Sequence, residues 1–348
     1  MLAAVYYGPQ DLRVEERPLP AIAPGEALLK VRAAGICGTD LRIYHGAHRK
    51  FPPGTVRVPG HEVVGEIAAL GAGVQGLEVG ERVFFAPNWG CGHCKQCVSG
   101  NHNLCANYDA IGINYDGAFA QYVRIPAAPI LQGNVFPVSE CIDPAAAALI
   151  EPFACVLRGQ DALHIQPGEI VLVVGAGPIG LMHVLLAQMR GAGKVLLSEV
   201  NPERARRAEA MGVPLVINPP TQDLAAIVAE QTAGLGVDVA IVAAPAHAAM
   251  EQALELLAIR GRVCLFAGLP KDRPLIQFNA NLVHYKELTV TGTTACSAGD
   301  CRKAAAILAS GRIDLSGIVG LRFPLSQAVE AFQAAEAGHS LKVILEPL

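Results

Sequence analysis

The stretch from Glu169 to Glu199 constrains the fold of this chain more than any other. An apolar run, Ile170–Val174, precedes a glycine-rich turn, a helical run to about Arg190 and a second apolar run, Lys194–Ser198. This order of strand, turn, helix and strand is typical of a βαβ unit in a parallel sheet. The unit ends at an acidic residue, Glu199, at the point where the second strand ends.

The turn itself, Gly175-Ala176-Gly177-Pro178-Ile179-Gly180, predicts a site for the pyrophosphate of a dinucleotide. Gly175 permits a tight turn, Gly177 leaves room for the phosphates, and Gly180 lets the helix pack on the strand. The N-terminus of the helix adds free N–H groups and a positive dipole. A plain glycine turn in a buried parallel sheet is the alternative, but the acid at Glu199 favours the nucleotide site.

Glu199 also predicts which dinucleotide is bound. A carboxylate at the end of the second strand accepts hydrogen bonds from the ribose hydroxyls of NAD and repels the 2′-phosphate of NADP. Arg204 would offset part of that repulsion if it turned toward the ribose, but we expect it to stack on the adenine or lie on the helix surface. NAD is therefore the predicted cofactor. Further cofactor contacts are expected at Arg204, Phe266, Gly268, Gly292 and Thr293.

Composition limits the class of protein. The chain has 348 residues, enough for two domains, and is 52% hydrophobic, with a mean hydropathy of +0.36. Its net charge of −4 gives no electrostatic reason to expect nucleic acid or anionic lipid as a partner. No apolar run reaches the ~18 residues of a membrane span, and Met1 to Pro20 carries no signal-peptide core. We therefore expect a soluble cytoplasmic protein.

The pattern along the chain predicts two kinds of domain. Residues 1–154 are rich in Gly and Pro and hold short β-type runs, which suggest a β-rich, barrel-like domain. From about Cys155, strands alternate with helices, so the fold class is α/β with a doubly wound parallel sheet. The tail from about Thr293 shows two helical stretches and a final strand-like run. The expected strands are Ala27–Val31, Val63–Ile67, Arg82–Phe85, Leu215–Ile217, Val237–Ala243, Arg262–Phe266, Leu288–Thr291 and Leu341–Glu346, and the later helices are Pro202–Met211, Gln222–Thr232 and His247–Ala258.

Four of the ten cysteines lie on one short loop. Cys91, Cys94, Cys97 and Cys105 form C-x2-C-x2-C-x7-C, and four thiolates can close a tetrahedral zinc site with no open position. Such a site is structural. Free thiols or a disulfide pair are the alternatives, but the spacing and the expected cytosolic location disfavour both. His93 and His102, in the same loop, are expected to be solvated.

A second set of candidate ligands begins earlier in the chain. Cys37 opens the run Cys37-Gly38-Thr39-Asp40, and His61 and Glu62 follow further along. A thiolate, an imidazole and a carboxylate suit Zn²⁺, and three protein ligands leave one position for water or substrate. Glu151 is a further candidate, and Asp40 could accept a hydrogen bond from the second nitrogen of His61. Taken singly, these residues also fit a core cysteine and solvated acids.

Together these motifs resemble the zinc-dependent medium-chain dehydrogenases over essentially the whole chain. The stretch from Gly60 to Val74 reads G-H-E-x2-G-x5-G-x2-V, which resembles the zinc signature of that family, and the cysteine loop and glycine turn follow in the family's order. Three features resemble the sorbitol, threonine and sugar-alcohol dehydrogenase branch. They are C-G-T-D at Cys37–Asp40, the glutamate of Glu151-Pro152, and Gly112–Tyr122, which is similar to a stretch of threonine dehydrogenase.

The resemblance implies a GroES-like catalytic domain formed by residues 1–154 and 293–348, with a Rossmann domain, residues 155–292, between them. It implies catalytic zinc at Cys37, His61 and Glu62, with Glu151 binding the metal directly or through its water, and Asp40 behind it. With the cysteine loop this makes two zinc ions per chain. A homo-oligomer, dimer or tetramer, is also implied. A zinc-free relative such as a quinone reductase is disfavoured because both metal motifs are complete.

These features predict an enzyme that oxidises a secondary alcohol, one hydroxyl of a polyol or sugar derivative, with NAD as acceptor. Thr39 is expected to take the substrate proton and pass it toward solvent. L-threonine is the alternative substrate, although the sequence from His284 to Thr293 looks more like the sugar-alcohol enzymes. A catalytically silent NAD-binding redox sensor using Cys296 or Cys301 is the alternative from another class.

The segment around Arg42 leaves two questions open. Arg42 stands where many relatives have a proton-relay histidine. The basic run that also contains His45, His48, Arg49 and Lys50 fits a solvated loop, or a site that holds a carboxylate or phosphate of the substrate. Tyr44 and Phe119 fit either the pocket lining or the core.

Overall fold

The structure, a computed structural model, describes residues 1–338 and 340–347. The chain divides into two compact units, which we call the first unit (Met1–Ala154 with Ala295–Leu348) and the second unit (Cys155–Thr294). Helix α5 (Ile150–Asp161) carries the chain from one to the other. Among the described residues, no helix is both long enough and apolar enough to cross a membrane.

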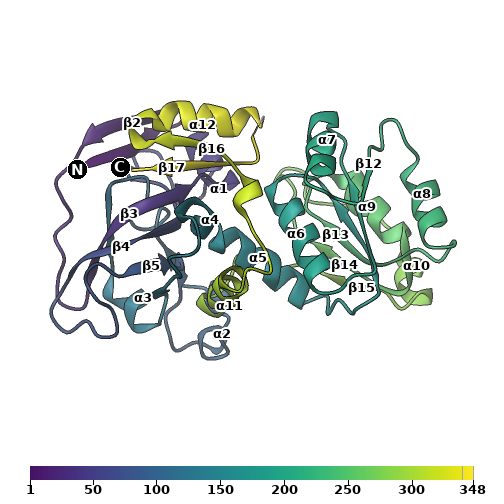
Figure 1. Cartoon of the computed structure of the whole chain (residues 1–348), viewed down its shortest axis with the longest axis horizontal. Helices are drawn as coiled ribbons and strands as arrows, with labels where there is room; N and C mark the ends of the chain where they lie inside the picture. Colours follow the sequence, from purple (N-terminus) through teal and green to yellow (C-terminus); the bar gives the residue numbers. More distant parts are fainter. Residues whose placement is uncertain (339, 348) are drawn as a thin grey trace. The chain divides into compact units, whose positions relative to one another are not determined.

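The second unit is built on a six-stranded parallel sheet in the order β12-β11-β10-β13-β14-β15, shown in teal and green in Figure 1. The order reverses at β10, the first strand of this unit, as in doubly wound nucleotide-binding folds. The strands are β10 (Ile170–Val174), β11 (Lys194–Ser198), β12 (Leu215–Ile217), β13 (Val237–Val242), β14 (Leu257–Leu265) and β15 (Thr289–Thr291). The helices are α6 (Pro178–Met189), α7 (Pro202–Ala210), α8 (Leu224–Gln231), α9 (His247–Glu255) and α10 (Ala280–Tyr285).

One predicted boundary in this unit is wrong. The helix expected over His247–Ala258 ends at Glu255, and β14 begins at Leu257, well before the expected Arg262. Leu257 pairs with Val237 of β13, and a positive φ of 59° at Arg260 breaks helical geometry. Strand pairing therefore overrides the helical pattern of the local sequence.

The first unit is organised around a mixed sheet in the order β16-β17-β3-β4-β5-β9, with β8 also paired to β3. Strand β17 (Lys342–Glu346), from the end of the chain, pairs antiparallel with β3 (Ala27–Gly35). In Figure 1 the yellow β17 lies beside the purple strands of the chain's start. Phe332 from the tail packs edge-on against Phe119 at 5.6 Å between ring centroids, and both rings are buried. The C-terminal segment thus completes the core of the first unit.

The other elements of the first unit are short and follow from local sequence. Its remaining strands are β1 (Leu2–Gly8), β2 (Asp11–Glu16), β4 (Glu62–Leu70), β5 (Arg82–Phe85), β6 (Asn88–Trp89), β7 (Asp109–Ala110), β8 (Tyr122–Ile125), β9 (Val135–Pro137) and β16 (Val319–Pro324). Its helices are α1 (Gly38–Tyr44), α2 (Lys95–Val98), α3 (Ala127–Leu131), α4 (Pro144–Ala148), α11 (Ala298–Ala309) and α12 (Ala328–Ala337), with 3-10 turns η1 (His102–Leu104), η2 (Ser316–Ile318) and η3 (Leu325–Gln327).

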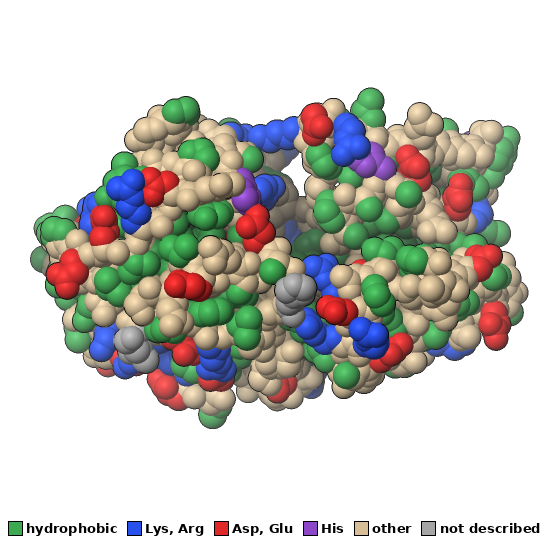
Figure 2. Space-filling view, turned by 90° about the horizontal axis from the view of Figure 1, so that it is seen from above, with side chains coloured by type: hydrophobic (Ala, Val, Ile, Leu, Met, Phe, Trp, Pro, Cys, Tyr) green, Lys and Arg blue, Asp and Glu red, His purple; other side chains and the backbone are tan. Residues whose placement is uncertain are grey.

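Charged side chains are mixed by sign on the face of the molecule that Figure 2 presents. In Figure 2, acidic and basic groups are interspersed among apolar and neutral ones. This distribution agrees with the small net charge of −4.

Candidate metal centres and cofactor site

The four cysteines of the loop converge in the structure. The Sγ atoms of Cys91, Cys94, Cys97 and Cys105 all lie within 4.8 Å of one another, and three of the pairs are 3.5, 3.8 and 4.0 Å apart. A tetrahedral zinc ion bound at about 2.3 Å would hold its four sulfurs about 3.8 Å apart. The donor set therefore fits a closed zinc site, as the spacing predicts.

The same loop gives its thiols different acidities. Backbone N–H groups of His93 and Cys94 lower the pKa of Cys91 to about 6. Burial raises the pKa of Cys97 to about 12. A metal ion would bring all four to the thiolate form, because metal binding releases the remaining protons.

The two histidines of this loop differ from each other. His93 is exposed, and its Nδ1 lies 2.9 Å from the carbonyl oxygen of Cys91. His102 is only half-exposed, and its Nε2 accepts a hydrogen bond from the backbone N–H of Ala298 at 3.0 Å. The expectation that His102 is simply solvated is therefore wrong, because this ring reaches the first residue of α11.

Cys37, His61 and Glu62 form a second cluster, with ligand atoms within 4.8 Å of one another. Cys37 occupies the N-cap of α1, and Glu62 opens β4 directly after His61. The main chain before His61 requires glycine, since Gly60 has a φ of +99° and a Cβ there would lie 2.7 Å from the ring of Phe119. This explains the glycine of the G-H-E motif and places Phe119 in the core.

The buried polar atoms of this cluster fit a cation. Asp40 accepts a hydrogen bond from the backbone N–H of Cys37 through Oδ2, and its Oδ1 lies 3.4 Å from His61 Nδ1. Within the described part of the chain, Glu62 Oε2 is buried without a hydrogen-bond partner, whereas His61 Nδ1 faces Asp40. Such an unpartnered atom is costly unless something binds it. A zinc ion held by Cys37, His61 and a carboxylate suits this donor set.

Glu62 has a partner that local sequence does not indicate. Lys342, from β17, donates a hydrogen bond to Glu62 Oε1 at 2.6 Å, and both side chains are almost fully buried. Burial opposes the charge on Lys342, but Glu62, Cys37 and Glu151 outweigh it and raise the pKa of the ammonium above its ordinary value. The ammonium of Lys342 and the carboxylate of Glu62 therefore form a buried ion pair beside the cluster.

Glu151 is not one of the residues in that three-residue cluster. It lies in the first turn of α5 and is buried, with an exposure of 7%. The thiol of Cys296 donates to the carboxylate Oε1 and to the backbone oxygen of Glu151, both at 3.8 Å. The charge of Glu151 also contributes to the raised pKa of Lys342, though less than Glu62 and Cys37 do.

Thr39 and Arg42 lie next to the cluster on α1. An N–H of Arg42 donates to Thr39 Oγ1 at 2.9 Å, so the hydroxyl hydrogen of Thr39 is available to another acceptor. The neighbouring basic residues are partly anchored. His45 Nε2 lies 2.5 Å from Glu336 Oε1, and Lys50 donates to Tyr108 O and Asn114 Oδ1. The basic segment from Arg42 to Lys50 is therefore not simply a solvated loop, because His45 and Lys50 bond to residues outside it.

In the second unit, the predicted cofactor residues gather at one edge of the sheet. The glycine turn follows β10, Glu199 follows β11, Phe266 and Gly268 follow β14, and Gly292 and Thr293 follow β15. Since all these strands are parallel, their carboxyl ends share an edge, where doubly wound folds bind dinucleotides.

The turn after β10 has the glycine geometry expected of a phosphate-binding loop. A Cβ at Gly180 would lie 1.7 Å from the carbonyl oxygen of Gly175, so no other residue fits. A Cβ at Gly177 would meet nothing within 4 Å, which leaves open space at the start of α6. Pro178 and Ile179 form the first turn of that helix.

Glu199 is fixed against this turn. Its Oε2 accepts a hydrogen bond from the backbone N–H of Ala176 at 2.7 Å, and its Oε1 accepts one from Asn201 at 2.8 Å. The residue is 6% exposed, whereas Arg204 lies half-exposed on α7. The carboxylate is thus held at the loop where a ribose would lie.

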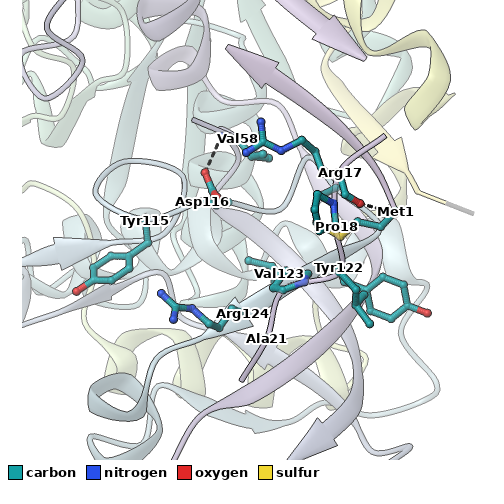
Figure 3. Close-up of a pocket in the computed structure, with 14 residues that line it drawn as sticks. Met1, Arg17, Pro18, Ala21, Val58, Tyr115, Asp116, Tyr122, Val123 and Arg124 are labelled. Carbon is teal, nitrogen blue, oxygen red and sulfur yellow. Dashed lines mark hydrogen bonds between the residues drawn. The ribbon is translucent and has the colours of Figure 1, made fainter. Parts of the chain in front are cut away.

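A separate cavity of about 380 Å³ opens in the first unit, and its lining contains none of the predicted site residues. Arg17, Tyr122, Arg124 and Asp116 line it together with the N-terminal methionine (Figure 3). Asp116 is engaged by the main chain, accepting a hydrogen bond from Val58 N at 3.0 Å. The lining has neither Cys nor His and so lacks the ligands of either metal cluster.

The chain is similar to known proteins over its full length. The model of the alcohol dehydrogenase GroES-like domain matches residues 23–134, and that of the zinc-binding dehydrogenases matches residues 178–310. A sorbitol dehydrogenase of Halalkalibacterium halodurans is 32% identical over 352 residues, covering 100% of this chain and 99% of that protein. An L-threonine 3-dehydrogenase of Pyrococcus horikoshii is 36% identical over 346 residues, covering 97% and 95%. The crystal structure of a zinc-binding dehydrogenase from Sinorhizobium meliloti, bound to NADP, has a TM-score of 0.91 at 32% identity, with 99% of each chain covered.

The chain therefore belongs to the zinc-binding medium-chain dehydrogenases. This confirms the resemblance, the α/β fold class with GroES-like and Rossmann parts, and an oxidoreductase that acts on alcohols.

Sequence reasoning missed Lys342 beside the metal clusters, and it did not predict the contacts of Cys296 and His102. Lys342 carried a usable signal, because it is a lone lysine inside an otherwise apolar strand-like run. Nothing local indicates that Cys296 contacts Glu151, or that His102 caps a helix almost 200 positions away.

Proposed function

We propose that this protein is a zinc- and NAD-dependent oxidoreductase that oxidises a secondary alcohol, one hydroxyl of a polyol or sugar derivative, to a ketone. The observation that carries the proposal is the cluster of Cys37, His61 and Glu62, in which the buried Glu62 Oε2 has no hydrogen-bond partner among the described residues. Three ligands of this kind leave a position for substrate.

The roles of the chain's own residues follow from their contacts. When bound, zinc at this cluster would supply a Lewis acid that lowers the pKa of a substrate hydroxyl, and the nicotinamide would supply the hydride acceptor. Thr39 Oγ1 accepts the substrate proton as the hydroxyl releases its own proton toward solvent, and an N–H of Arg42 donates to that oxygen. Asp40 orients His61, and Lys342 balances the charge of Glu62. Glu151 would bind the same zinc ion as a further carboxylate, either directly or through a water molecule.

The remaining assignments are part of the same proposal. The first unit is the catalytic domain and the second binds the dinucleotide. Four thiolates at Cys91, Cys94, Cys97 and Cys105 hold a structural zinc, giving two per chain. From the family resemblance, the protein works in the cytoplasm as a homodimer or homotetramer. L-threonine is the second candidate substrate, because the Pyrococcus horikoshii relative is a threonine dehydrogenase.

A substrate panel tests the reaction. We expect NADH absorbance to rise with at least one member of a set of sugar alcohols, inositols, sugar acids, butanediol and threonine, using protein that holds about two zinc ions per chain. Oxidation of threonine alone would favour the second candidate. No turnover with any member, in protein that carries both metals and binds NAD, would favour a catalytically silent sensor.

The cofactor preference is tested at Glu199. We expect kcat/KM to favour NAD over NADP by ~100-fold or more, on the order of 3 kcal/mol, and Glu199→Ser to narrow this gap. Glu203→Ser, an exposed acid in the first turn of α7, is the matched control and should leave the preference unchanged. The NADP in the Sinorhizobium meliloti relative makes this measurement necessary. Equal use of both cofactors by the parent would contradict the assignment.

A further inference from the structure

The start of α11 is fixed by its own sequence. Ser297 is the N-cap, and its hydroxyl accepts a hydrogen bond from Asp300 N at 3.2 Å, while Asp300 Oδ2 accepts one from Ser297 N at 2.9 Å. This reciprocal pair is a capping box. It holds the residue before the cap, Cys296, in a defined position.

Two cysteines flank this cap and pack on each other. Cys296 lies immediately before the N-cap, and Cys301 is the fourth residue of the helix. These are the positions that a hydrophobic staple joins. Their sulfurs are 3.6 Å apart, and the two residues are 1% and 0% exposed. The staple directs the Cys296 thiol at Glu151, whose Oε1 and backbone oxygen lie 3.8 Å away.

The cysteine loop supplies the next hydrogen bond at this helix start. The N–H of Ala298, the first residue of α11, has no partner within the helix, and His102 Nε2 accepts its hydrogen bond at 3.0 Å. His102 opens η1, between Cys97 and Cys105. A continuous set of contacts therefore runs from the cysteine loop through the start of α11 to Glu151.

We propose that the four-cysteine loop positions Glu151 through His102, the start of α11 and the thiol of Cys296. The loop stabilises the first unit and also sets the position of a carboxylate used in the reaction. His102 and Cys296 are positioning residues in this scheme, since neither belongs to the Cys37 cluster. The inference rests on the role given to Glu151 in the proposed function. It assigns a catalytic consequence to a loop whose expected role is structural.

The test compares pairs of variants in the full-length zinc-loaded enzyme. We expect Cys296→Ala and His102→Ala to lower kcat ~10-fold, the lower end of the effect of outer-shell partners. The KM for NAD should not change. Cys296→Ser and His102→Gln, which restore a donor and an acceptor, should recover most of the loss. His93→Ala is the matched control, because the ring of this exposed histidine lies 2.9 Å from the carbonyl oxygen of Cys91, within its own loop. It should behave like the parent.

Two further measurements separate positioning from a general loss of structure. In a Glu151→Gln background, Cys296→Ala and His102→Ala should cause no additional loss of kcat, because their effect passes through Glu151. Both single variants should also release the metal of the Cys37 cluster to a chelator ~10-fold faster, with cysteine-loop zinc retained. Cys296→Val keeps the side-chain volume without the donor, and it replaces Cys296→Ala if that variant melts early.

The outcomes distinguish this inference from the proposed function. If Glu151→Gln is impaired but the Cys296 and His102 variants match the parent, the coupling is overturned while the function stands. The coupling would also be overturned if Cys296→Ala or His102→Ala lowered kcat further in the Glu151→Gln background. If Glu151→Gln itself keeps parental kcat and metal retention, the role of Glu151 fails and the inference fails with it.

Discussion

The two metal clusters of the first unit are built in opposite ways. The four-cysteine loop takes all its ligands from the short segment between Cys91 and Cys105, and three of the four are only half-buried. The other cluster joins Cys37 at a helix start to His61 and Glu62 at a strand start, and Lys342 reaches it from the end of the chain. The first can form from a local segment, whereas the second exists only once the sheet is assembled.

This difference predicts which property of the protein is lost when each cluster loses a ligand. The four-cysteine loop has little core of its own and gains order from the metal. Replacing one of its ligands should therefore mainly lower the stability of the protein. The residues of the Cys37 cluster lie on elements that are held by their own hydrogen bonds and packing. Replacing a ligand there should therefore mainly lower kcat/KM. Three substitutions test this contrast, in order of their expected effect on turnover.

Cys37→Ser should have the largest effect. A serine hydroxyl is a poor zinc ligand, so we expect bound zinc to fall from about two to about one per chain. The value of kcat/KM should fall by ~1000-fold or more, at least about 4 kcal/mol. The fold should persist, because serine is a favoured residue at the helix N-cap that Cys37 occupies. Metal analysis, kinetics and thermal melting check this, with the exposed Cys141→Ser as control. Unchanged activity would contradict the assignment of the open cluster.

Lys342→Met should have an intermediate effect on turnover and a clear effect on stability. It leaves the carboxylate of Glu62, which is 0% exposed, without its cation. Breaking a buried ion pair in this way costs about 3–5 kcal/mol, so denaturant unfolding should show a loss of that order. We also expect kcat to fall ~10-fold or more as the cluster next to it shifts.

The neighbouring strand offers a matched control for this change. Arg322 of β16 pairs with Asp143 and Glu346, but its side chain is 42% exposed. Exposed pairs contribute about 0–1 kcal/mol, so Arg322→Met should cost little. The double variant Glu62→Gln, Lys342→Met should regain stability relative to Lys342→Met, because no unpaired charge remains. Equal losses in Lys342→Met and Arg322→Met would refute the special role of the buried pair.

The contrast between a site built from one local segment and a site assembled from distant segments also explains what the sequence could predict. The βαβ unit and the cysteine loop depend on spacing within about 30 residues, where turn chemistry and ligand geometry act directly. Both were therefore predicted residue by residue, and the structure brings the four thiols together and holds Glu199 at the glycine turn. The G-H-E motif was likewise visible, because Gly60 is required by local backbone geometry.

Contacts between distant segments could not be predicted in this way. Lys342 meets Glu62 only because β17 pairs with β3, beside β4, and that register is decided by the assembled sheet. Cys296 approaches Glu151 because of the staple at the start of α11, which local sequence defines without naming its neighbour. The helix expected to continue to Ala258 failed for the same reason, since pairing of Leu257 with β13 outweighed propensity.

Cys97→Ser should have the smallest effect on turnover and the opposite profile to Cys37→Ser. The variant keeps the open cluster, so we expect about one zinc per chain, now bound at Cys37, His61 and a carboxylate. The loop has no buried residue in α2 to replace the metal's contribution, so Tm should fall by ~5–10 °C, about 2–3 kcal/mol. We expect kcat to fall only a few-fold, to the extent that His102 no longer holds the start of α11. Calorimetry, metal analysis and kinetics on Cys37→Ser and Cys97→Ser, measured side by side, test whether the two clusters have different roles. If both variants lost turnover equally and melted alike, the two clusters would share one role, and the distinction between a local structural site and an assembled catalytic site would be wrong.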